Sequence, residues 1–360
     1  MNQDIDLVAV DIGYGYVKAI SRNTNKRVIF AAGVGDPVDD KTLGLLGKNS
    51  EEDDPNNIHI RINAKEYFVG ELAKKKSPEF RTALDNRRYE NDIMNTLLNV
   101  AIQLVSDSED VYLVTGLPYE LYAKHRDSLI ESVSGNQPPV EWKSGSRQGT
   151  KQQVNVEKAI ILPQAMSAVF SVLFNEKGDP IRPDLMDEDT TIGLIDIGHK
   201  TTDYVFLEIE ENGQLFPVDT KSSTINAGGV DMDQAIKDKF IKETDETDIS
   251  QRNLKKAYNK GKLKYRSDSQ DKNIDFSNEI QSTKEKIAGK IFGEIGNYWG
   301  NELNTIDEIF FVGGGVLLYG KEVQEKFGNR LKEINDSQFA NVQGYLFYGD
   351  NILKQQTKEN

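Results

Sequence analysis

Short β-branched apolar runs begin the chain and are separated by a glycine turn. The runs Leu7–Ile12 and Tyr16–Ile20 flank the turn Gly13–Gly15, which predicts a β-hairpin. A third strand is expected at Arg27–Ala32, and the Asp-, Asn-, Gly- and Lys-rich residues 36–57 are expected to form an irregular insertion. The chain therefore opens with a small antiparallel unit.

Between residues 90 and 174, segments with apolar residues at helical spacing alternate with short apolar runs that predict buried strands. The polar segment 134–153 contains Pro138 and Pro139 and is expected to form an exposed loop or hairpin. Proline fits the first turn of a helix, so Pro163 is expected to open one that runs to Phe174. The other predicted elements are the helices Glu90–Val105 and Glu120–Val133 and the strands Val111–Val114 and Val156–Leu162.

The second half of the chain begins again with strands. A charged surface loop is expected at residues 176–190, and helical segments are expected to dominate residues 231–301. The predicted strands are Ile192–Ile197, Thr202–Glu208, one near Leu215–Asp219 and Ile306–Val312, and the last leads through glycines into a helix from Gly320 to about Lys332.

An internal repeat links the two halves. Residues 10–18, VDIGYGYVK, and residues 195–203, IDIGHKTTD, each place Asp-Ile-Gly after a hydrophobic strand and before another strand. The spacing is about half of a 360-residue chain, which is long enough for two domains. The repeat therefore predicts two duplicated lobes.

The repeated motif has the residue types of a phosphate site. A glycine at a hairpin tip lets backbone N–H groups approach a phosphate. Asp11 and Asp196 end their strands, where a carboxylate can hold Mg²⁺ directly or through water. Two such hairpins would hold phosphates from both sides, although a single Asp-Ile-Gly is also an ordinary turn.

A run of three glycines follows the last long strand. Gly313, Gly314 and Gly315 favour a nucleoside contact, because a flat ligand can lie against bare backbone there. A plain helix-entry turn is the alternative. The following residues nearly spell a Walker A loop, but Glu322 stands where Ser or Thr would bind Mg²⁺, so a P-loop is rejected.

Composition narrows the class of protein. The chain has no cysteine, which excludes disulfides, thiolate metal sites and cysteine nucleophiles. Its formal net charge is −14, so direct non-specific nucleic-acid binding is unfavourable and a link to DNA would need an adaptor. No apolar run spans a bilayer and the acidic start is unlike a signal peptide, so a cytoplasmic protein without membrane contact is expected.

In order along the chain, these motifs resemble those of the actin-like ATPases, most closely the bacterial plasmid-segregation actins of the ParM (StbA) type. The matching stretches are residues 11–15 (DIGYG), 162–165 (LPQA), 196–203 (DIGHKTTD), 226–231 (NAGGVD), 311–315 (FVGGG) and 338–346 (QFANVQGYL). His199 stands where the family often has Gly or Ser, and is given no role.

The resemblance implies an α/β actin-like fold with two ribonuclease-H-like lobes, each with a mixed five-stranded sheet, and a nucleotide cleft. The first lobe would comprise residues 1–163 and 336–360, with a variable insertion near 33–90, and the second lobe residues 164–335. ATP, or GTP, and Mg²⁺ would be the cofactors. Asp11 and Asp196 would be the metal-side carboxylates, and Gln164 would position the attacking water or, alternatively, serve as a helix cap. Nucleotide contacts are implied for Gly13, Tyr14, Gly15, Tyr16, Lys18, Gly198, Lys200, Thr201, Gly228, Gly229, Gly313, Gly314 and Gly315.

The function implied by the resemblance is Mg-dependent ATP hydrolysis coupled to filament assembly. Its partners would be further copies of itself and a DNA-binding adaptor at a plasmid centromere-like site. The alternatives are a small-molecule kinase of the same superfamily, a chaperone-like ATPase switch, and a binding module without catalysis. A kinase would need an acceptor pocket, for which the sequence offers no convincing motif.

Overall fold

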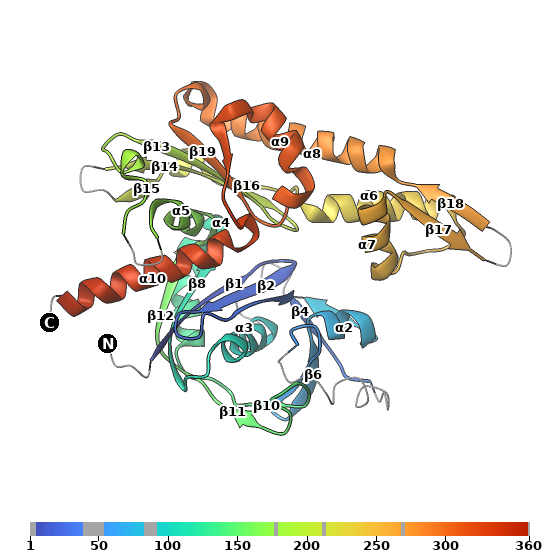
Figure 1. Cartoon of the computed structure of the whole chain (residues 1–360), viewed down its shortest axis with the longest axis horizontal. Coiled ribbons are helices and arrows are strands. Elements are labelled where there is room, and N and C mark those ends of the chain that lie inside the picture. The colour runs from blue at the N-terminus through green and yellow to red at the C-terminus, as the bar shows by residue number, and fades with distance from the viewer. Residues whose placement is uncertain are drawn as a thin grey trace. The chain divides into compact units, whose positions relative to one another are not determined.

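The computed structural model describes residues 5–38, 54–82, 92–175, 179–210, 214–267 and 271–358, which form two compact units (Figure 1). Unit 1 comprises Met1–Asp187 and Phe339–Asn360, and unit 2 comprises Glu188–Gln338. The division falls after residue 187 rather than after residue 163, because the helix that follows Pro163 belongs to unit 1. Most of the insertion predicted at 36–57 lies outside the described residues.

Unit 1 contains a six-stranded sheet with the strand order β3-β2-β1-β8-β12-β9. The hairpin predicted around Gly13–Gly15 is confirmed, with β1 and β2 antiparallel, whereas β8 runs parallel to β1 and β12 runs parallel to β8. The strands are β1 (Asp6–Ile12), β2 (Tyr16–Ser21), β3 (Arg27–Ala31), β8 (Asp110–Leu117), β9 (Gly135–Asn136) and β12 (Asn155–Pro163).

Helices cover the two faces of this sheet. Alternate residues of β1 point to opposite faces, so Val8 and Val10 share one buried cluster with α3, while Leu7 and Ala9 share another with α10. The helices of unit 1 are α2 (Glu71–Lys76), α3 (Asp92–Val105), α4 (Tyr119–Val133), α5 (Gln164–Leu173) and α10 (Ala340–Lys358), with a 3-10 turn at Pro183–Leu185. The chain's last helix is therefore part of the layer that covers its first strand.

The α5 and α10 helices pack at close range. A Cβ on Gly344 would lie 1.8 Å from the carbonyl oxygen of Ser167, so only glycine fits at this crossing. The Ser167 hydroxyl also donates to the Asn341 carbonyl at 3.2 Å. This packing is the reason why α5 belongs to unit 1.

A second sheet in unit 1 corrects the prediction for residues 134–153. The order is β11-β10-β5-β6-β4-β7, and β10 and β11 do form a hairpin. The segment is not simply exposed, because Val140 and Trp142 are buried and the Trp142 Nε1–H donates to Gln103 Oε1 at 3.2 Å. The strands are β4 (Gly33–Gly35), β5 (Ile58–Ile62), β6 (Lys65–Val69), β7 (Phe80–Thr82), β10 (Val140–Trp142) and β11 (Lys151–Gln152).

Unit 2 repeats the main sheet of unit 1. Its order β15-β14-β13-β19-β20 matches β3-β2-β1-β8-β12, with the same sequence of antiparallel and parallel pairings. The strands are β13 (Thr191–Ile197), β14 (Thr202–Ile209), β15 (Leu215–Pro217), β16 (Ser223–Ile225), which also pairs with β14, β19 (Glu308–Val312) and β20 (Leu331–Glu333). The duplication predicted from the Asp-Ile-Gly repeat is therefore a duplication of topology, and the predicted α/β class with two duplicated lobes is confirmed.

Two predictions for unit 2 need revision. Helices do dominate residues 231–301, but β17 (Lys262–Arg266) and β18 (Asp271–Asp275) form a hairpin within this region that the sequence analysis did not predict. The last helix of the unit begins directly after the glycine run rather than at residue 320, and it ends before β20. The helices are α6 (Gly229–Glu243), α7 (Gln251–Lys260), α8 (Ser277–Trp299) and α9 (Val316–Phe327).

Candidate functional site

The two Asp-Ile-Gly motifs form the same turn. In unit 1 the Gly13 N–H donates to the Tyr16 carbonyl at 3.0 Å, and in unit 2 the Gly198 N–H donates to the Thr201 carbonyl at 2.8 Å. A Cβ would lie 3.1 Å from that carbonyl oxygen at Gly13 and 2.9 Å from it at Gly198. The turn therefore leaves no room for a Cβ at Gly198 and little room at Gly13, and the repeat extends from sequence and topology to hydrogen bonding.

The first turn brings three predicted site residues together. Asp11 is 2% exposed, and its Oδ2 accepts from Lys18 Nζ at 2.9 Å. Its Oδ1 accepts from Gln164 Nε2 at 2.7 Å. Lys18 stands directly opposite Asp11 in the β1–β2 pairing, and Gln164 is the first residue of α5. The Gln164 amide therefore points to the carboxylate and does not cap its own helix.

The second turn carries a residue that the sequence analysis did not assign. Asp203 stands opposite Asp196 in the β13–β14 pairing, and both are buried, at 7% and 6% exposure. Directly opposed residues share one face of an antiparallel pair, where like charges are destabilising. Thr224 donates to one Asp203 oxygen through its hydroxyl. The repeat itself offered the signal, because Asp203 occupies the place that Lys18 has in unit 1.

These contacts test how Mg²⁺ would fit. Mg²⁺ keeps several waters and needs only one or two protein carboxylates besides phosphate. The described residues contain no cluster of three or more His, Asp or Glu side chains suited to a metal ion. The Asp196–Asp203 pair fits a hydrated cation, because a second carboxylate stands opposite Asp196 where unit 1 has Lys18 opposite Asp11. Asp11 fits direct ligation less well, since each of its oxygens already accepts from a side-chain donor.

The loop after Asp196 is fixed to the start of α6. The Gly229 N–H donates to the Gly198 carbonyl at 3.1 Å, and the Val230 N–H donates to the His199 carbonyl at 2.7 Å. A Cβ on Gly228 would lie 2.8 Å from each of these carbonyl oxygens, and one on Gly229 would lie 2.9 Å from His199 Nδ1. The observed role of both glycines is close packing beneath the loop, and their nucleotide contact stays a prediction.

The three glycines after β19 differ in their surroundings. Gly313 has φ +90°, and a Cβ there would lie 2.3 Å from Asp196 Oδ1. A Cβ on Gly315 would lie 2.2 Å from Ile197 Cγ2. At Gly314 the nearest atom would be 3.8 Å away, so the protein's own packing does not require glycine. Gly314 is therefore the member of the run that is open to a ligand.

The remaining predicted residues lie in or beside the two turns. The Gly15 carbonyl accepts from the Ala32 N–H at 3.0 Å, Tyr14 is half-buried, and Tyr16 is 41% exposed. Lys200 and Thr201 are half-buried in the second turn. These positions are compatible with the predicted nucleotide contacts and do not test them.

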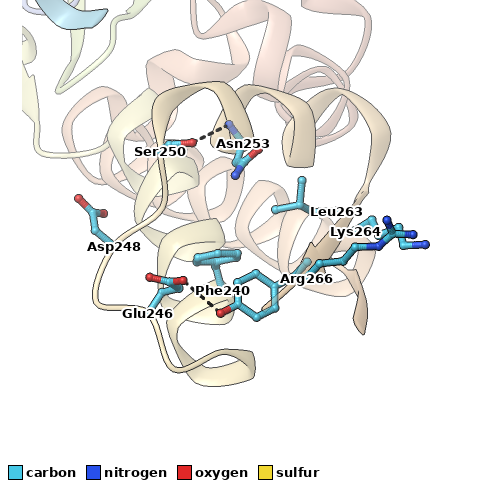
Figure 2. A pocket seen from close by; sticks show the side chains of 9 residues that line it. Phe240, Glu246, Asp248, Ser250, Asn253, Leu263, Lys264 and Arg266 are labelled. Carbon is cyan, nitrogen blue, oxygen red and sulfur yellow. Dashed lines mark hydrogen bonds between the residues drawn. The ribbon is translucent and has the colours of Figure 1, made fainter. Parts of the chain in front are cut away.

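A separate hollow lies elsewhere in unit 2. It has a volume of about 660 Å³ and is bounded by the end of α6, the start of α7 and β17 (Figure 2). None of the predicted site residues lines it.

Among the described residues, no helix has the length and hydrophobicity needed to cross a membrane.

Known proteins resemble both units. Residues 9–166 match the family model for the N-terminal domain of actin-like proteins, and residues 194–325 match the model for the C-terminal domain of archaeal MreB-like actin homologues. A search of the curated proteins found no match.

Solved structures cover nearly the whole chain. A non-polymerisable quadruple mutant of pCBH ParM is 26% identical, with a TM-score of 0.80, over 96% of this chain and 99% of that one. ParM in a 15-stranded filament from Clostridium botulinum is 25% identical, with a TM-score of 0.81, over 97% and 100%. An archaeal actin homologue in complex with ADP is 20% identical, with a TM-score of 0.76, over 96% and 100%.

Proposed function

Because this chain belongs to the actin-like proteins, among which it is similar to ParM, we propose that it is an ATPase whose nucleotide state controls its assembly into filaments. The observation that carries this proposal is the pair of equivalent turns, each with a buried Asp beside a glycine that closes the loop. Such turns suit phosphate binding, and phosphoryl transfer depends mainly on positioning and charge neutralisation.

The proposed roles follow from the contacts of each side chain. The turn residues Gly13, Tyr14, Gly15, Tyr16, Gly198, Lys200 and Thr201 bind the phosphates, and Gly314 lies against the nucleoside. Asp196 and Asp203 hold hydrated Mg²⁺, which supplies charge neutralisation at the phosphates when bound. Asp11 contacts the hydrated Mg²⁺ through a water molecule, and Lys18 balances the charge of the Asp11 carboxylate.

Gln164 is proposed to orient the attacking water. Its Nε2 is engaged by Asp11, which fixes the direction of the amide, and an amide can orient water but is no general base at neutral pH. Hydrolysis is therefore slow in the free subunit and faster when assembly improves the geometry. Gln164→Ala should lower phosphate release while polymer still forms.

The biological role proposed is plasmid segregation in the cytoplasm, with a DNA-binding adaptor linking the filament to its cargo. The solved filament of the Clostridium botulinum relative supports the assembly part of this proposal. The adaptor is proposed from the resemblance to the plasmid-segregation actins, and the acidity of the chain, which disfavours direct contact with DNA, agrees with it.

Light scattering and pelleting after addition of Mg-ATP, with phosphate release followed in parallel, test the proposal. Scattering should rise with ATP or GTP and decay as phosphate appears. Chelation of Mg²⁺ should abolish phosphate release. A protein that binds nucleotide and phosphorylates a small acceptor without forming polymer would instead be a kinase of the same superfamily.

A further inference from the structure

One segment of this acidic protein is strongly basic. Residues 251–266 contain seven Lys or Arg and no Asp or Glu. The whole chain has 44 basic and 58 acidic residues, so the remainder has 37 against 58. The positive charge is thus concentrated in α7 and β17, while the rest of the chain is more acidic than the average suggests.

The basic side chains of α7 share one face of the helix. Arg252, Lys256 and Lys260 recur at four-residue spacing, with Lys255 beside them, and all four are exposed. The opposite face is buried through Leu254. Within the described part of the chain, none of these four cations forms an ion pair with a carboxylate. They are not needed for local charge balance.

The β17–β18 hairpin, which follows α7, adds further basic side chains to those of the helix. Gly261, with φ +64°, ends α7 and leads directly into β17. Arg266 is balanced by an ion pair with Asp271 at 3.4 Å, but Lys264 faces the neutral Asn273 across the strands. We define the basic patch as five cations that form no ion pair with a carboxylate among the described residues, namely Arg252, Lys255, Lys256, Lys260 and Lys264.

The hollow described above adjoins the basic patch. Its apolar lining comes from Phe240, Leu263 and Tyr265. Its charged lining comes from Lys264 and Arg266 together with the carboxylates of Glu246 and Asp248 (Figure 2). The Tyr265 hydroxyl donates to Glu246 at 3.1 Å, and the Tyr265 ring packs edge-on to Phe240, so the lining is fixed. A volume of about 660 Å³ is enough for an inserted side chain from a partner.

We propose that the basic patch binds an acidic surface of a second copy of this chain, with a side chain of that copy inserted into the hollow. This inference rests on the proposed assembly and names one of its contact surfaces. Charge complementarity supports it, because the chain outside 251–266 is strongly acidic. If the patch and its acidic complement lie on separate faces, the contact is heterologous and can repeat from copy to copy, as open-ended assembly requires.

Charge reversal at Lys255 and Lys256 tests the proposal. The double variant Lys255→Glu/Lys256→Glu should raise the critical concentration for pelleting with Mg-ATP at least tenfold and remove most of its salt dependence. Its affinity for a fluorescent nucleotide should stay within twofold of the wild type. The matched control is Lys321→Glu/Lys326→Glu, which reverses two exposed charges on α9 and should leave assembly within twofold of the wild type.

Sedimentation velocity without nucleotide at low salt separates this inference from the proposed function. If the wild type fails to polymerise but self-associates in a manner lost in Lys255→Glu/Lys256→Glu, the inference stands and nucleotide control fails. Equal self-association of wild type and double variant overturns the inference. Binding of a 30-base-pair DNA duplex that depends on Lys255 and Lys256, with assembly unchanged, also overturns it in favour of a nucleic-acid partner.

Discussion

At the scale of single residues, Gly314 is a position where a substitution should change nucleotide binding without changing the stability of the fold. Its neighbours Gly313 and Gly315 have no room for a Cβ, whereas Gly314 does. Gly314→Ala should therefore leave the free energy of unfolding within about 0.5 kcal/mol of the wild type. It should weaken nucleotide binding about tenfold, or about 1.4 kcal/mol, because the added methyl group occupies ligand space.

Gly315→Ala is the matched control for that variant. Its Cβ would overlap Ile197, so the free energy of unfolding should fall by about 1–3 kcal/mol. Urea unfolding and titration with a fluorescent nucleotide measure both quantities. Equal nucleotide affinity in Gly314→Ala and the wild type would remove Gly314 from the site.

Asp203 gives a second prediction in which stability and activity change in opposite directions. Asp196 and Asp203 are both buried and lie directly opposite each other, and like charges in that arrangement are destabilising. Asp203→Asn should raise the metal-free free energy of unfolding by up to about 1 kcal/mol. It should also lower Mg-dependent phosphate release at least tenfold, since one carboxylate of the proposed metal pair is lost.

Thr224→Val is the control for Asp203→Asn, because it removes the hydrogen bond to Asp203 without changing charge. Phosphate release and chemical unfolding with and without Mg²⁺ are the measurements. If Asp203→Asn keeps full phosphate release, Asp203 serves only the packing of β14.

At the scale of elements, the same Gly→Ala change should have opposite effects at two positions. Gly261 has φ +64° at the end of α7, where alanine is strained, so Gly261→Ala should lower the free energy of unfolding by about 1–2 kcal/mol. Gly289 lies within α8, and a Cβ added there would meet no atom within 4 Å, so Gly289→Ala should raise the free energy of unfolding by up to about 1 kcal/mol. Urea unfolding of both variants is the measurement, and a loss of stability in Gly289→Ala would contradict the helix-propensity argument.

The elements also show what the sequence can and cannot predict. The strands on either side of each Asp-Ile-Gly motif were predictable, because long apolar runs ended at a glycine turn. The β17–β18 hairpin was missed although Leu263 and Tyr265 alternate with charged residues, because the surrounding helical pattern dominated the interpretation. Gly261 was the local signal that α7 ends there.

The residues of the candidate site could likewise be predicted from the sequence only in part. Asp11, Gln164 and Lys18 do meet in unit 1. Asp203 was missed because its importance depends on which residue faces Asp196 across two strands, and motif order alone does not give that register. The burial of Trp142 likewise depends on a second sheet whose strands are far apart in sequence.

At the scale of the whole molecule, α10 joins the end of the chain to its beginning. Asp350 of α10 forms an ion pair with Arg22 at 3.1 Å, but its Oδ2 has no hydrogen-bond partner among the described residues. Burial raises the pKa of Asp350 above its usual value of 3.8, and Arg22 offsets this only in part. The charged carboxylate is thus held at a cost in stability.

The sign of the pH dependence follows from that shift. The folded-state pKa is raised, so the contribution of Asp350 to stability is greatest below pH 3.8 and falls as pH rises through the folded pKa. Asp350→Asn should therefore raise the free energy of unfolding at pH 7, with the gain shrinking towards pH 4. Urea unfolding across this pH range measures the effect. Asp107→Asn, which neutralises an exposed carboxylate that pairs with the exposed Lys26, is the control and should show little change.

The return of the chain to unit 1 also has a consequence for protein synthesis. Strand β1 is synthesised before unit 2, whereas α10, which covers one face of its sheet, is synthesised after unit 2. Unit 2, which is continuous in sequence, can fold while that helix is still in the exit tunnel. We expect that unit 1 of a nascent chain stays incomplete until α10 has left the ribosome.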